Sequence, residues 1–175
     1  MKSTIALIGF MGGGKTVVGK ALARRLNQKF IELDSLIEQK ADKSIPEIFR
    51  HDGEIAFREL EIDVTKEVSQ EENTVIACGG GIVLNQINID RLRQKSKIVY
   101  LMSSPAVILK RLVSERGERP LLQVANPLLA IQELLEFRRP LYERAADITV
   151  NTSKMNIGEV VSQIIEKIKE DEGFN

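Results

Sequence analysis

The sequence predicts an α/β protein with a parallel sheet, and two observations support this class. Short apolar runs alternate with amphipathic helical stretches along the whole chain, which is typical of alternating strands and helices. The best of these runs are apolar at every position, as expected for strands that helices cover on both faces. With 175 residues, the chain is most simply a single domain, residues 1–175.

The alternating pattern gives an expected position for each strand and helix. We expect strands at 4–8, 29–33, 74–77, 98–102 and 147–150. We expect helices at 15–26, 34–39, 45–50, 54–69, 87–94, 105–115, 127–144 and 157–169. Ser104-Pro105 and Asn126-Pro127 resemble helix starts, because each places a capping side chain before a proline at the first helical position. Pro140 lies inside a helical pattern and predicts a kink or a local break.

Composition and charge argue against several classes of protein. The formal net charge is zero, so there is no general electrostatic attraction to nucleic acid or to an anionic membrane. No apolar run approaches the roughly 18 residues that a membrane helix needs. The single cysteine, Cys78, fits a reducing compartment, and the first strand begins too close to Met1 for a signal peptide. We therefore expect a cytoplasmic protein that binds neither nucleic acid nor membrane.

The strongest motif follows the first predicted strand directly. Residues 9–16 read Gly-Phe-Met-Gly-Gly-Gly-Lys-Thr, which matches the phosphate-binding loop G-x-x-x-x-G-K-[ST] between a strand and a helix. Glycines let backbone N–H groups approach phosphate oxygens, and the following helix points its positive end at the same anion. The nucleotide-binding residues expected here are Gly12, Gly13, Gly14, Lys15, Thr16 and Val17.

Two residues of this loop have distinct expected roles. Lys15 would neutralise the β- and γ-phosphates of ATP, and the Thr16 hydroxyl would be a ligand for Mg²⁺. The alternative is an ordinary glycine-rich turn with Lys15 in solvent, but the flanking strand and helix are those that the motif requires.

Two carboxylates lie at the end of the second predicted strand. Glu32 and Asp34 are two positions apart, so their side chains share a side if the strand continues. Beside a magnesium nucleotide, one could orient a metal-bound water and the other could accept a proton from a hydroxyl nucleophile. The alternatives are a helix N-cap for Asp34 and a plain surface carboxylate for Glu32.

Further candidates lie on later elements. Arg58 adjoins an apolar helical stripe, with Glu54 and Glu61 one turn away on either side. Its planar guanidinium could bind a carboxylate, or the arginine could form only a solvated ion pair. Three glycines at 79–81 end a buried strand and would let backbone approach a ligand. Arg138 precedes Pro140 and could point into a cleft or into water.

The segment 112–125 joins two predicted helices and contains Arg116, Gly117, Arg119 and Pro120. This composition suggests either a mobile lid that closes on an anion or a surface loop with solvated arginines.

Together, the motifs resemble the shikimate kinase family from the first strand to the last helix. The matching segments are Gly9-Phe-Met-Gly-Gly-Gly-Lys-Thr16, Asp34, Gly53-Glu-x-x-Phe-Arg58-x-x-Glu61, Gly79-Gly-Gly81, Arg119-Pro-Leu-Leu122 and Arg138-x-Pro-Leu-Tyr142. The phosphate-binding loop alone belongs to many nucleotide enzymes, whereas the order and spacing of the full set are specific. The resemblance implies a three-layer P-loop kinase fold like that of nucleoside monophosphate kinases, with a five-stranded parallel sheet, a substrate-binding helical region at about 34–61 and a lid at about 112–125.

The resemblance also implies an activity, a set of partners and residue roles. It implies transfer of the ATP γ-phosphoryl group to the 3-hydroxyl of shikimate, with Mg²⁺, by a protein that is expected to be a monomer. Catalysis would depend on Lys15, Asp34 and Arg119, the last reaching the nucleotide from the lid. Thr16, and Glu32 through a water, would hold the metal. Shikimate would be bound by Asp34, Arg58, Glu61, Gly79, Gly80, Gly81 and Arg138, with Arg58 and Arg138 clamping its carboxylate.

The sequence departs from the family pattern at three positions. The family usually has aspartate where Glu32 stands, and threonine or serine often stands at the position of Cys78. An arginine near the adenine of some members falls at about Met155, which leaves Lys154 as the substitute.

Gluconate would in principle satisfy both the arginine pair and Asp34, so only the family resemblance favours shikimate over it. A gluconate-type or nucleotide kinase would share the fold, and a non-catalytic nucleotide-binding module would not need Asp34, Arg58 and Arg119 on the acceptor side. No basic face or aromatic-basic pattern supports a nucleic-acid ATPase.

Overall fold

The computed structural model describes residues 3–115 and 120–173. Five parallel strands form one sheet in the order β2-β3-β1-β4-β5. The strands are β1 (Thr4–Ile8), β2 (Lys29–Glu32), β3 (Thr74–Ala77), β4 (Ser96–Met102) and β5 (Ile148–Asn151). The predicted α/β class and the five-stranded parallel sheet are confirmed.

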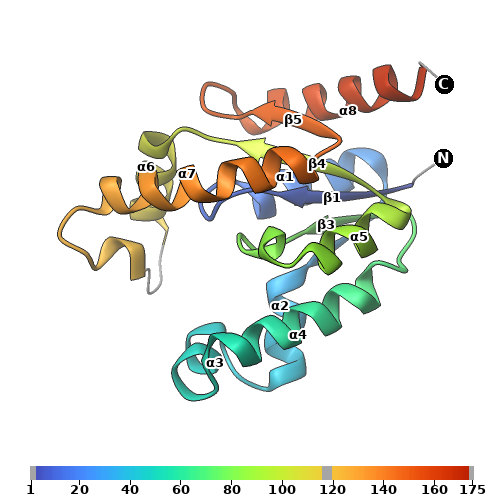
Figure 1. The fold of residues 1–175 in the computed structure, drawn as a ribbon. Helices are drawn as coiled ribbons and strands as arrows, with labels where there is room; N and C mark the ends of the chain where they lie inside the picture. Colours follow the sequence, from blue (N-terminus) through green and yellow to red (C-terminus); the bar gives the residue numbers. More distant parts are fainter. Residues whose placement is uncertain (1–2, 116–119, 174–175) are drawn as a thin grey trace.

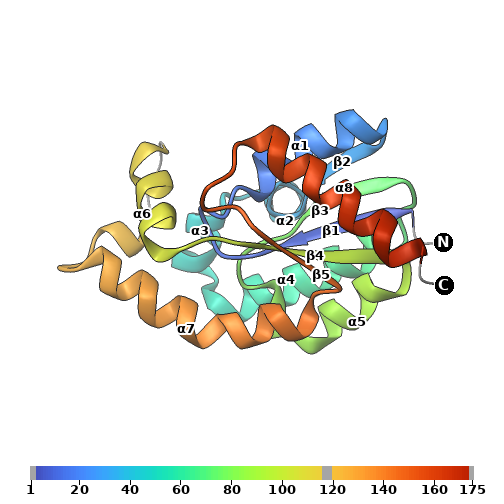
Figure 2. The same ribbon diagram turned by 90° about the horizontal axis from the view of Figure 1, so that it is seen from above.

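Helices cover both faces of the sheet, as Figures 1 and 2 show. The α-helices are α1 (Lys15–Leu26), α2 (Leu33–Ala41), α3 (Ile45–His51), α4 (Gly53–Val68), α5 (Gln86–Lys95), α6 (Pro105–Ser114), α7 (Pro127–Ala145) and α8 (Ile157–Gly173). Helices α1 and α8 pack against each other on one face, and α5 and α7 lie on the other. This gives the three layers that the resemblance implied.

The core consists of two apolar clusters, one on each side of the sheet. Strand residues alternate between them: Leu7 of β1 packs with Leu22 of α1 and Ile164 of α8, whereas Ile8 packs with residues of the opposite helices. Nearly all positions of β1, β3 and β4 are buried, because central parallel strands face helices on both sides.

Helices α2, α3 and α4 form a separate helical layer that extends from the β2 edge of the sheet (Figure 1). Ser44 begins α3 with a capping box, accepting a hydrogen bond from the backbone N–H of Glu47 while the Glu47 carboxylate accepts from the backbone N–H of Ser44. The layer places the first half of α4 beside the carboxyl ends of the strands, where the site described below is found.

The topology creates a crevice at these carboxyl ends. The chain leaves β1 toward α1 on one face and leaves β3 toward α5 on the other, although β1 and β3 are neighbours. Such a switch point is where open α/β sheets bind ligands. The glycine-rich turns after β1 and β3 therefore meet at one place.

Most predicted elements are confirmed to within a few residues, and Ser104 and Asn126 do cap their helices through hydrogen bonds to Val107 N and Leu129 N. Two short 3₁₀ helices, η1 (Ile82–Leu84) and η2 (Pro120–Leu122), were not predicted. Of the kink or local break predicted at Pro140, the break is wrong, because α7 continues through this residue. Within the described ranges, no helix is long and apolar enough to span a membrane.

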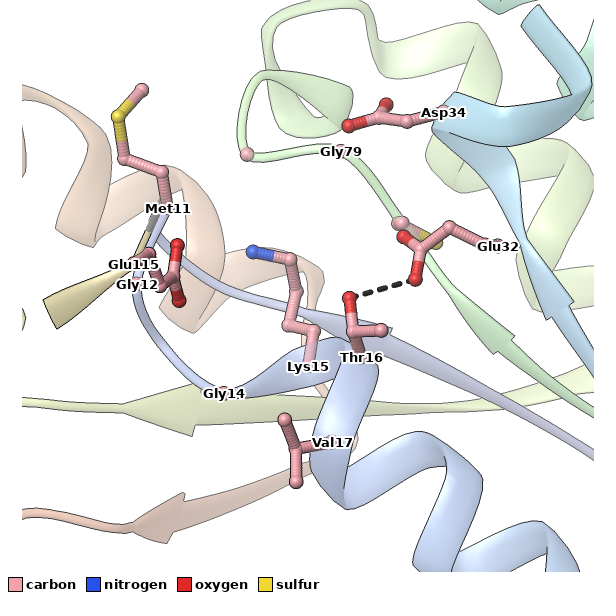
Figure 3. Close-up of a pocket in the computed structure, with 12 residues that line it drawn as sticks. Met11, Gly12, Gly14, Lys15, Thr16, Val17, Glu32, Asp34, Gly79 and Glu115 are labelled. Carbon is pink, nitrogen blue, oxygen red and sulfur yellow. Dashed lines mark hydrogen bonds between the residues drawn. The ribbon is translucent and has the colours of Figure 1, made fainter. Parts of the chain in front are cut away.

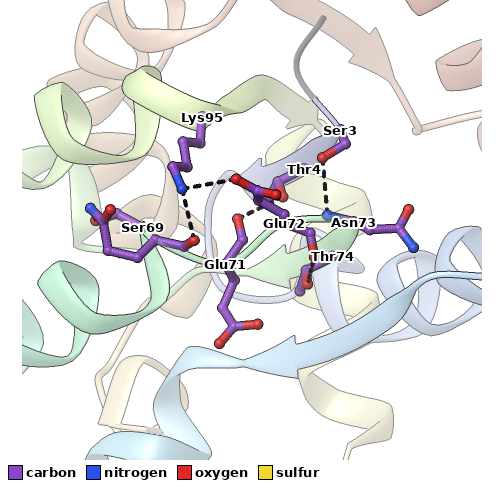
Figure 4. Close-up of polar contacts among 9 residues, drawn as sticks. Ser3, Thr4, Ser69, Glu71, Glu72, Asn73, Thr74 and Lys95 are labelled. Carbon is purple, nitrogen blue, oxygen red and sulfur yellow. Dashed lines mark hydrogen bonds and ion pairs between the residues drawn. The ribbon is translucent and has the colours of Figure 1, made fainter.

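A cluster of polar contacts lies at the opposite end of the sheet, where β1 and β3 begin (Figure 4). The Thr4 hydroxyl donates to the carbonyl of Glu71 at 2.9 Å, and Ser3 Oγ accepts from the backbone N–H of Asn73 at 3.0 Å. Lys95 reaches the same loop through the Gln70 carbonyl and the Glu72 carboxylate. These bonds fix the start of β3 against β1, at the end of the sheet away from the crevice.

Candidate active site

The phosphate-binding loop joins β1 to α1 in the conformation that the motif requires. Gly12 and Gly14 have φ values of 70° and 86°, in the left-handed region that favours glycine, and Gly13 N donates to the Phe10 carbonyl at 3.0 Å. Gly14 also stands at the N-cap of α1, so the positive end of the helix faces the loop. The loop is thus shaped for an anion at the switch point of the sheet.

Lys15 points its ammonium group back into the loop. Its Nζ donates to the carbonyls of Gly9 at 2.8 Å and Phe10 at 2.9 Å. Burial lowers the pKa of Lys15, whereas the charges of Asp34 and Glu32 act in the opposite direction. A cation held this close to the mouth of the loop can contact a phosphate by a small movement of its flexible stem.

Thr16 and Glu32 meet on the other side of the same pocket. The Thr16 hydroxyl donates to Glu32 Oε2 at 2.7 Å, as Figure 3 shows. Burial raises the pKa of Glu32, and the hydrogen bond from Thr16 opposes this shift. Glu32 is the last residue of β2 and the N-cap position of α2, so its side chain leaves the sheet at the crevice.

Asp34 lies in the first turn of α2, in agreement with the helix expected from residue 34, so the condition that the strand continues to Asp34 is not met. It still lines the same pocket as Lys15 and Glu32, because α2 starts at the carboxyl end of β2. Burial raises the pKa of Asp34, and the charge of Lys15 is the largest opposing effect. Its Oδ1 atom is buried and has no hydrogen-bond partner among the described residues.

Arg58 and Glu61 form a buried pair on α4. Arg58 Nη1 donates to Glu61 Oε1 at 2.9 Å, and the Glu61 side chain has no exposed surface. The interpretation of Arg58 as one half of a merely solvated pair is therefore wrong. Burial raises the pKa of Glu61, and the charge of Arg58 lowers it. Within the described ranges, Glu61 Oε2 and Arg58 Nε lack a partner.

The glycines after β3 are packed against these charged groups. A Cβ atom on Gly79 would lie 2.9 Å from Asp34 Oδ1 and 3.3 Å from Glu61 Oε2. A Cβ atom on Gly81 would lie 2.5 Å from both terminal nitrogens of Arg58. The absence of side chains at these positions lets the turn approach the acidic and basic groups of α2 and α4.

Arg138 reaches the same turn from α7. Its guanidinium lies over the ring of Phe10, 5.9 Å from the ring centroid, and its Nη1 would be 3.8 Å from a Cβ atom on Gly80. Arg138 Nε is buried without a hydrogen-bond partner in the part of the chain that the structure describes. Arg138 therefore points inward, not into water, and lies near the glycine turn that Arg58 also contacts.

A second, more apolar pocket adjoins the loop on the side of α6 and β5. It is lined by Gly13, Gly14, Val17, Val18, Arg111, Ser114, Glu115, Thr152, Met155, Ile157 and Val160. Arg111 spans its floor, with Nη1 donating to the Gly12 carbonyl at 3.3 Å and Nη2 to the Thr152 carbonyl at 3.3 Å. Burial lowers the pKa of Arg111, and the charge of Glu115 opposes this.

Glu115 lines both this pocket and the pocket at the phosphate-binding loop. In Figure 3 its carboxylate stands beside Gly12, on the same side of the loop as the Lys15 ammonium. An anionic side chain thus lies at the junction between the two pockets.

Most of the predicted site residues converge on this crevice. Gly12, Gly14, Lys15, Thr16, Val17, Glu32, Asp34, Gly79 and Gly80 line one pocket, and Arg58, Glu61, Gly81 and Arg138 adjoin it through the glycine turn. Cys78 also lines the pocket, and burial raises the pKa of its thiol. Arg119 falls in 116–119, outside the described residues.

The sequence-based predictions did not include Arg111, Glu115 or the Tyr142 hydroxyl, although Tyr142 belongs to a matched motif. The spacing of Arg111 does not distinguish it from a solvated helical arginine.

The chain has a five-stranded parallel sheet with a phosphate-binding loop. Buried acidic and basic groups face that loop across the switch point. These features define the chain as a P-loop kinase. The family model described as shikimate kinase matches residues 11–169. The chain therefore belongs to the shikimate kinase family.

Individual relatives agree with this assignment. The chain is 47% identical to a shikimate kinase of Caldanaerobacter subterraneus over 161 residues, covering 92% of this chain and 93% of the relative. It is 44% identical to a shikimate kinase of Thermus thermophilus over 164 residues, covering 94% and 89%.

Among solved structures, it superposes on the shikimate kinase from Acinetobacter baumannii in complex with shikimate with a TM-score of 0.91 and 36% identity, covering 98% of this chain and 95% of that one. A gluconokinase from Sinorhizobium meliloti, with a TM-score of 0.62 and 18% identity, shares only the fold.

Proposed function

We propose that this protein transfers the γ-phosphoryl group of ATP to the 3-hydroxyl of shikimate, giving shikimate 3-phosphate and ADP. One observation carries the acceptor half of this proposal: four buried polar atoms around the glycine turn lack partners among the described residues. Asp34 Oδ1 and Glu61 Oε2 can accept hydrogen bonds, and two guanidinium nitrogens, those of Arg58 and Arg138, can donate them. A ligand with both hydroxyls and a carboxylate satisfies both kinds of atom.

The donor half of the reaction would lie in the phosphate-binding loop. The N–H groups of the loop and the positive end of α1 would hold the β- and γ-phosphates, and Lys15 would turn from the Gly9 and Phe10 carbonyls toward them. The apolar pocket beside Arg111 adjoins the same loop and would accept the nucleoside. Arg119 is proposed to reach the transferred group from the lid.

The residues present fit a magnesium ion. The Thr16 hydroxyl and the Glu32 carboxylate provide oxygen donors of the kind that Mg²⁺ prefers, and Mg²⁺ is commonly held by one or two protein groups together with phosphate oxygens. Thr16 would bind the metal, and Glu32 would hold a metal-bound water. The bound metal supplies neutralisation of the phosphate charge.

Asp34 is the proposed base. Its burial raises its pKa, which makes the carboxylate a better proton acceptor than a solvated aspartate. The neighbouring Lys15 keeps the ionised form accessible. Asp34 would hold the reacting hydroxyl and take its proton as the oxygen attacks the γ-phosphorus.

Arg58 and Arg138 are proposed to bind the carboxylate of the acceptor, and their position fixes which hydroxyl faces Asp34. Glu61 would hold Arg58 in place through the 2.9 Å hydrogen bond. The backbone of the turn at 79–81 would contact the acceptor ring, since its glycines already lie against the acidic and basic groups.

A coupled assay of ADP formation with shikimate, gluconate and nucleoside monophosphates as acceptors tests the proposal. We expect turnover with shikimate far above background and above the other acceptors. Turnover with gluconate alone would indicate the gluconate-type alternative, and nucleotide binding without turnover on any acceptor would indicate a binding module.

We further propose that the protein acts as a monomer in the cytoplasm, without nucleic-acid or membrane partners. The formal net charge of zero supports the absence of nucleic-acid and anionic-membrane partners. Gel filtration at assay concentration tests the monomer directly.

A further inference from the structure

Tyr142 is a fully buried side chain of α7 whose hydroxyl reaches the glycine turn. The hydroxyl donates to the Gly80 carbonyl at 2.5 Å, across 62 positions of sequence. Arg138 lies one turn earlier on α7, and its positive charge opposes the rise that burial causes in the pKa of Tyr142. The phenol oxygen therefore ties the turn after β3 to α7, the helix that carries Arg138 of the proposed carboxylate clamp.

The bond from Tyr142 to Gly80 is important because the turn at 79–81 is packed closely on several sides. Gly79 lies against Asp34 and Glu61, Gly81 lies against Arg58, and a Cβ atom on Gly80 would be 3.3 Å from the backbone nitrogen of Met11 in the phosphate-binding loop. A shift of the Gly80 peptide would therefore change the distances from the turn to the groups on α2 and α4. Tyr142 holds that peptide from the side of α7.

The ring of Tyr142 is held independently of its hydroxyl. It stacks on Tyr100 of β4 with a centroid distance of 5.0 Å and an interplanar angle of 22°. Both rings are almost completely buried. Removal of the Tyr142 hydroxyl therefore leaves the ring in its slot and takes away only its polar contacts.

We propose that Tyr142 is a positioning residue for the acceptor half of the site: its hydroxyl fixes the Gly80 peptide relative to α7, which carries Arg138, so that shikimate meets a preformed turn and clamp. This inference rests on the proposed function, because it assigns Gly80 and Arg138 to the acceptor. It concerns a residue that lies behind the site.

The first test compares Tyr142→Phe with Tyr100→Phe. We expect Tyr142→Phe to raise the shikimate KM about tenfold, the usual scale for leaving a buried carbonyl without its donor, while the ATP KM changes less than twofold. Tyr100→Phe removes a hydroxyl from the same ring stack but keeps the bond to Gly80, so both KM values should stay within twofold of wild type. Thermal unfolding of both variants verifies that they are folded.

The second test uses spectroscopy, because the chain has two tyrosines and no tryptophan. In Tyr100→Phe the only tyrosine is Tyr142, and we expect shikimate to change its near-ultraviolet absorption and emission saturably. In Tyr142→Phe the remaining Tyr100 should show a much smaller change at saturating shikimate. ADP alone, which would occupy the donor half, should produce little change in either variant.

The outcomes separate this inference from the proposed function. If wild-type protein does not phosphorylate shikimate, the proposed function fails and this inference fails with it. If wild type is active but Tyr142→Phe leaves the shikimate KM unchanged, or raises both KM values equally, only the positioning role is refuted. An equal spectroscopic response from the two single-tyrosine variants would also refute it.

Discussion

Gly81→Ala tests the packing of the glycine turn against the proposed clamp. Gly81 has φ −96° and ψ 6°, which alanine can adopt, so the substitution brings little backbone strain. Its Cβ atom would lie 2.5 Å from Nη1 and Nη2 of Arg58, about 1 Å closer than an ordinary van der Waals contact. The guanidinium must therefore move by about 1 Å, a misplacement that can cost up to a hundredfold in an active site.

The expected result is a rise of roughly ten- to a hundredfold in the shikimate KM, about 1.4–2.8 kcal/mol of binding free energy. The displacement also strains the 2.9 Å bond from Arg58 to the buried carboxylate of Glu61. The ATP KM should change less than twofold, because the nearest atoms that the new Cβ would meet all belong to Arg58 and none to the phosphate-binding loop. Steady-state kinetics with each substrate varied in turn measure both constants.

Gly53→Ala is a suitable control for this substitution. Gly53 has a φ of 86°, and a Cβ atom there would meet no other atom within 4 Å. Alanine at this position should cost about 1 kcal/mol of stability through backbone strain and leave both KM values unchanged. The reasoning is refuted if Gly81→Ala keeps the shikimate KM within twofold of wild type, or if the control raises it equally.

Four further predictions follow from the charged groups. Asp34→Asn should lower kcat by roughly a hundredfold or more; unchanged turnover would remove Asp34 from the mechanism. Burial raises the pKa of Asp34 above its ordinary 3.8, so the ionised carboxylate lowers the stability of the fold above that pH. Asp34→Asn should therefore raise Tm at pH 7. In a series of thermal melts at different pH, this gain should disappear below about pH 4. Arg58→Ala should raise the shikimate KM at least tenfold more than the ATP KM, whereas equal effects would contradict a carboxylate clamp. Glu115→Gln should tighten ATP binding about threefold at low salt, because a carboxylate beside the phosphate-binding loop repels phosphate. Calorimetry measures the affinity, and weaker binding by the variant would refute this prediction.

The sequence predicted the fold well because its signals were local. Apolar runs identified the strands, and the motif at residues 9–16 fixed the first strand, the loop and α1 together. Helix boundaries at Ser104 and Asn126 followed from side-chain capping, which depends only on adjacent residues. The error at Pro140 arose because local propensity favours a break there, whereas the packing of α7 on the sheet keeps the helix continuous.

The site was predictable only in part, for the same reason. Helical spacing was enough to place Arg58 beside Glu61. The burial that makes this pair strong could not be predicted, because it depends on α2 and on the turn after β3. Arg111 binds Gly12 across 99 positions and Thr152 across 41, and no local pattern carries such contacts. Tyr142 matched a motif, but its bond to Gly80 depends on how α7 crosses the sheet.

The buried charges also explain why the acceptor half is built around glycines. Asp34 and Glu61 both lose hydration, and burial raises the pKa of each, so both cost the protein stability when ionised. Side chains on the turn at 79–81 would fill the space in which a ligand can reach these groups. A polar acceptor that supplies hydroxyl donors to the carboxylates and a carboxylate to the arginines would compensate the lost hydration. Binding of the correct acceptor would then stabilise the fold and assemble the catalytic geometry through the same contacts.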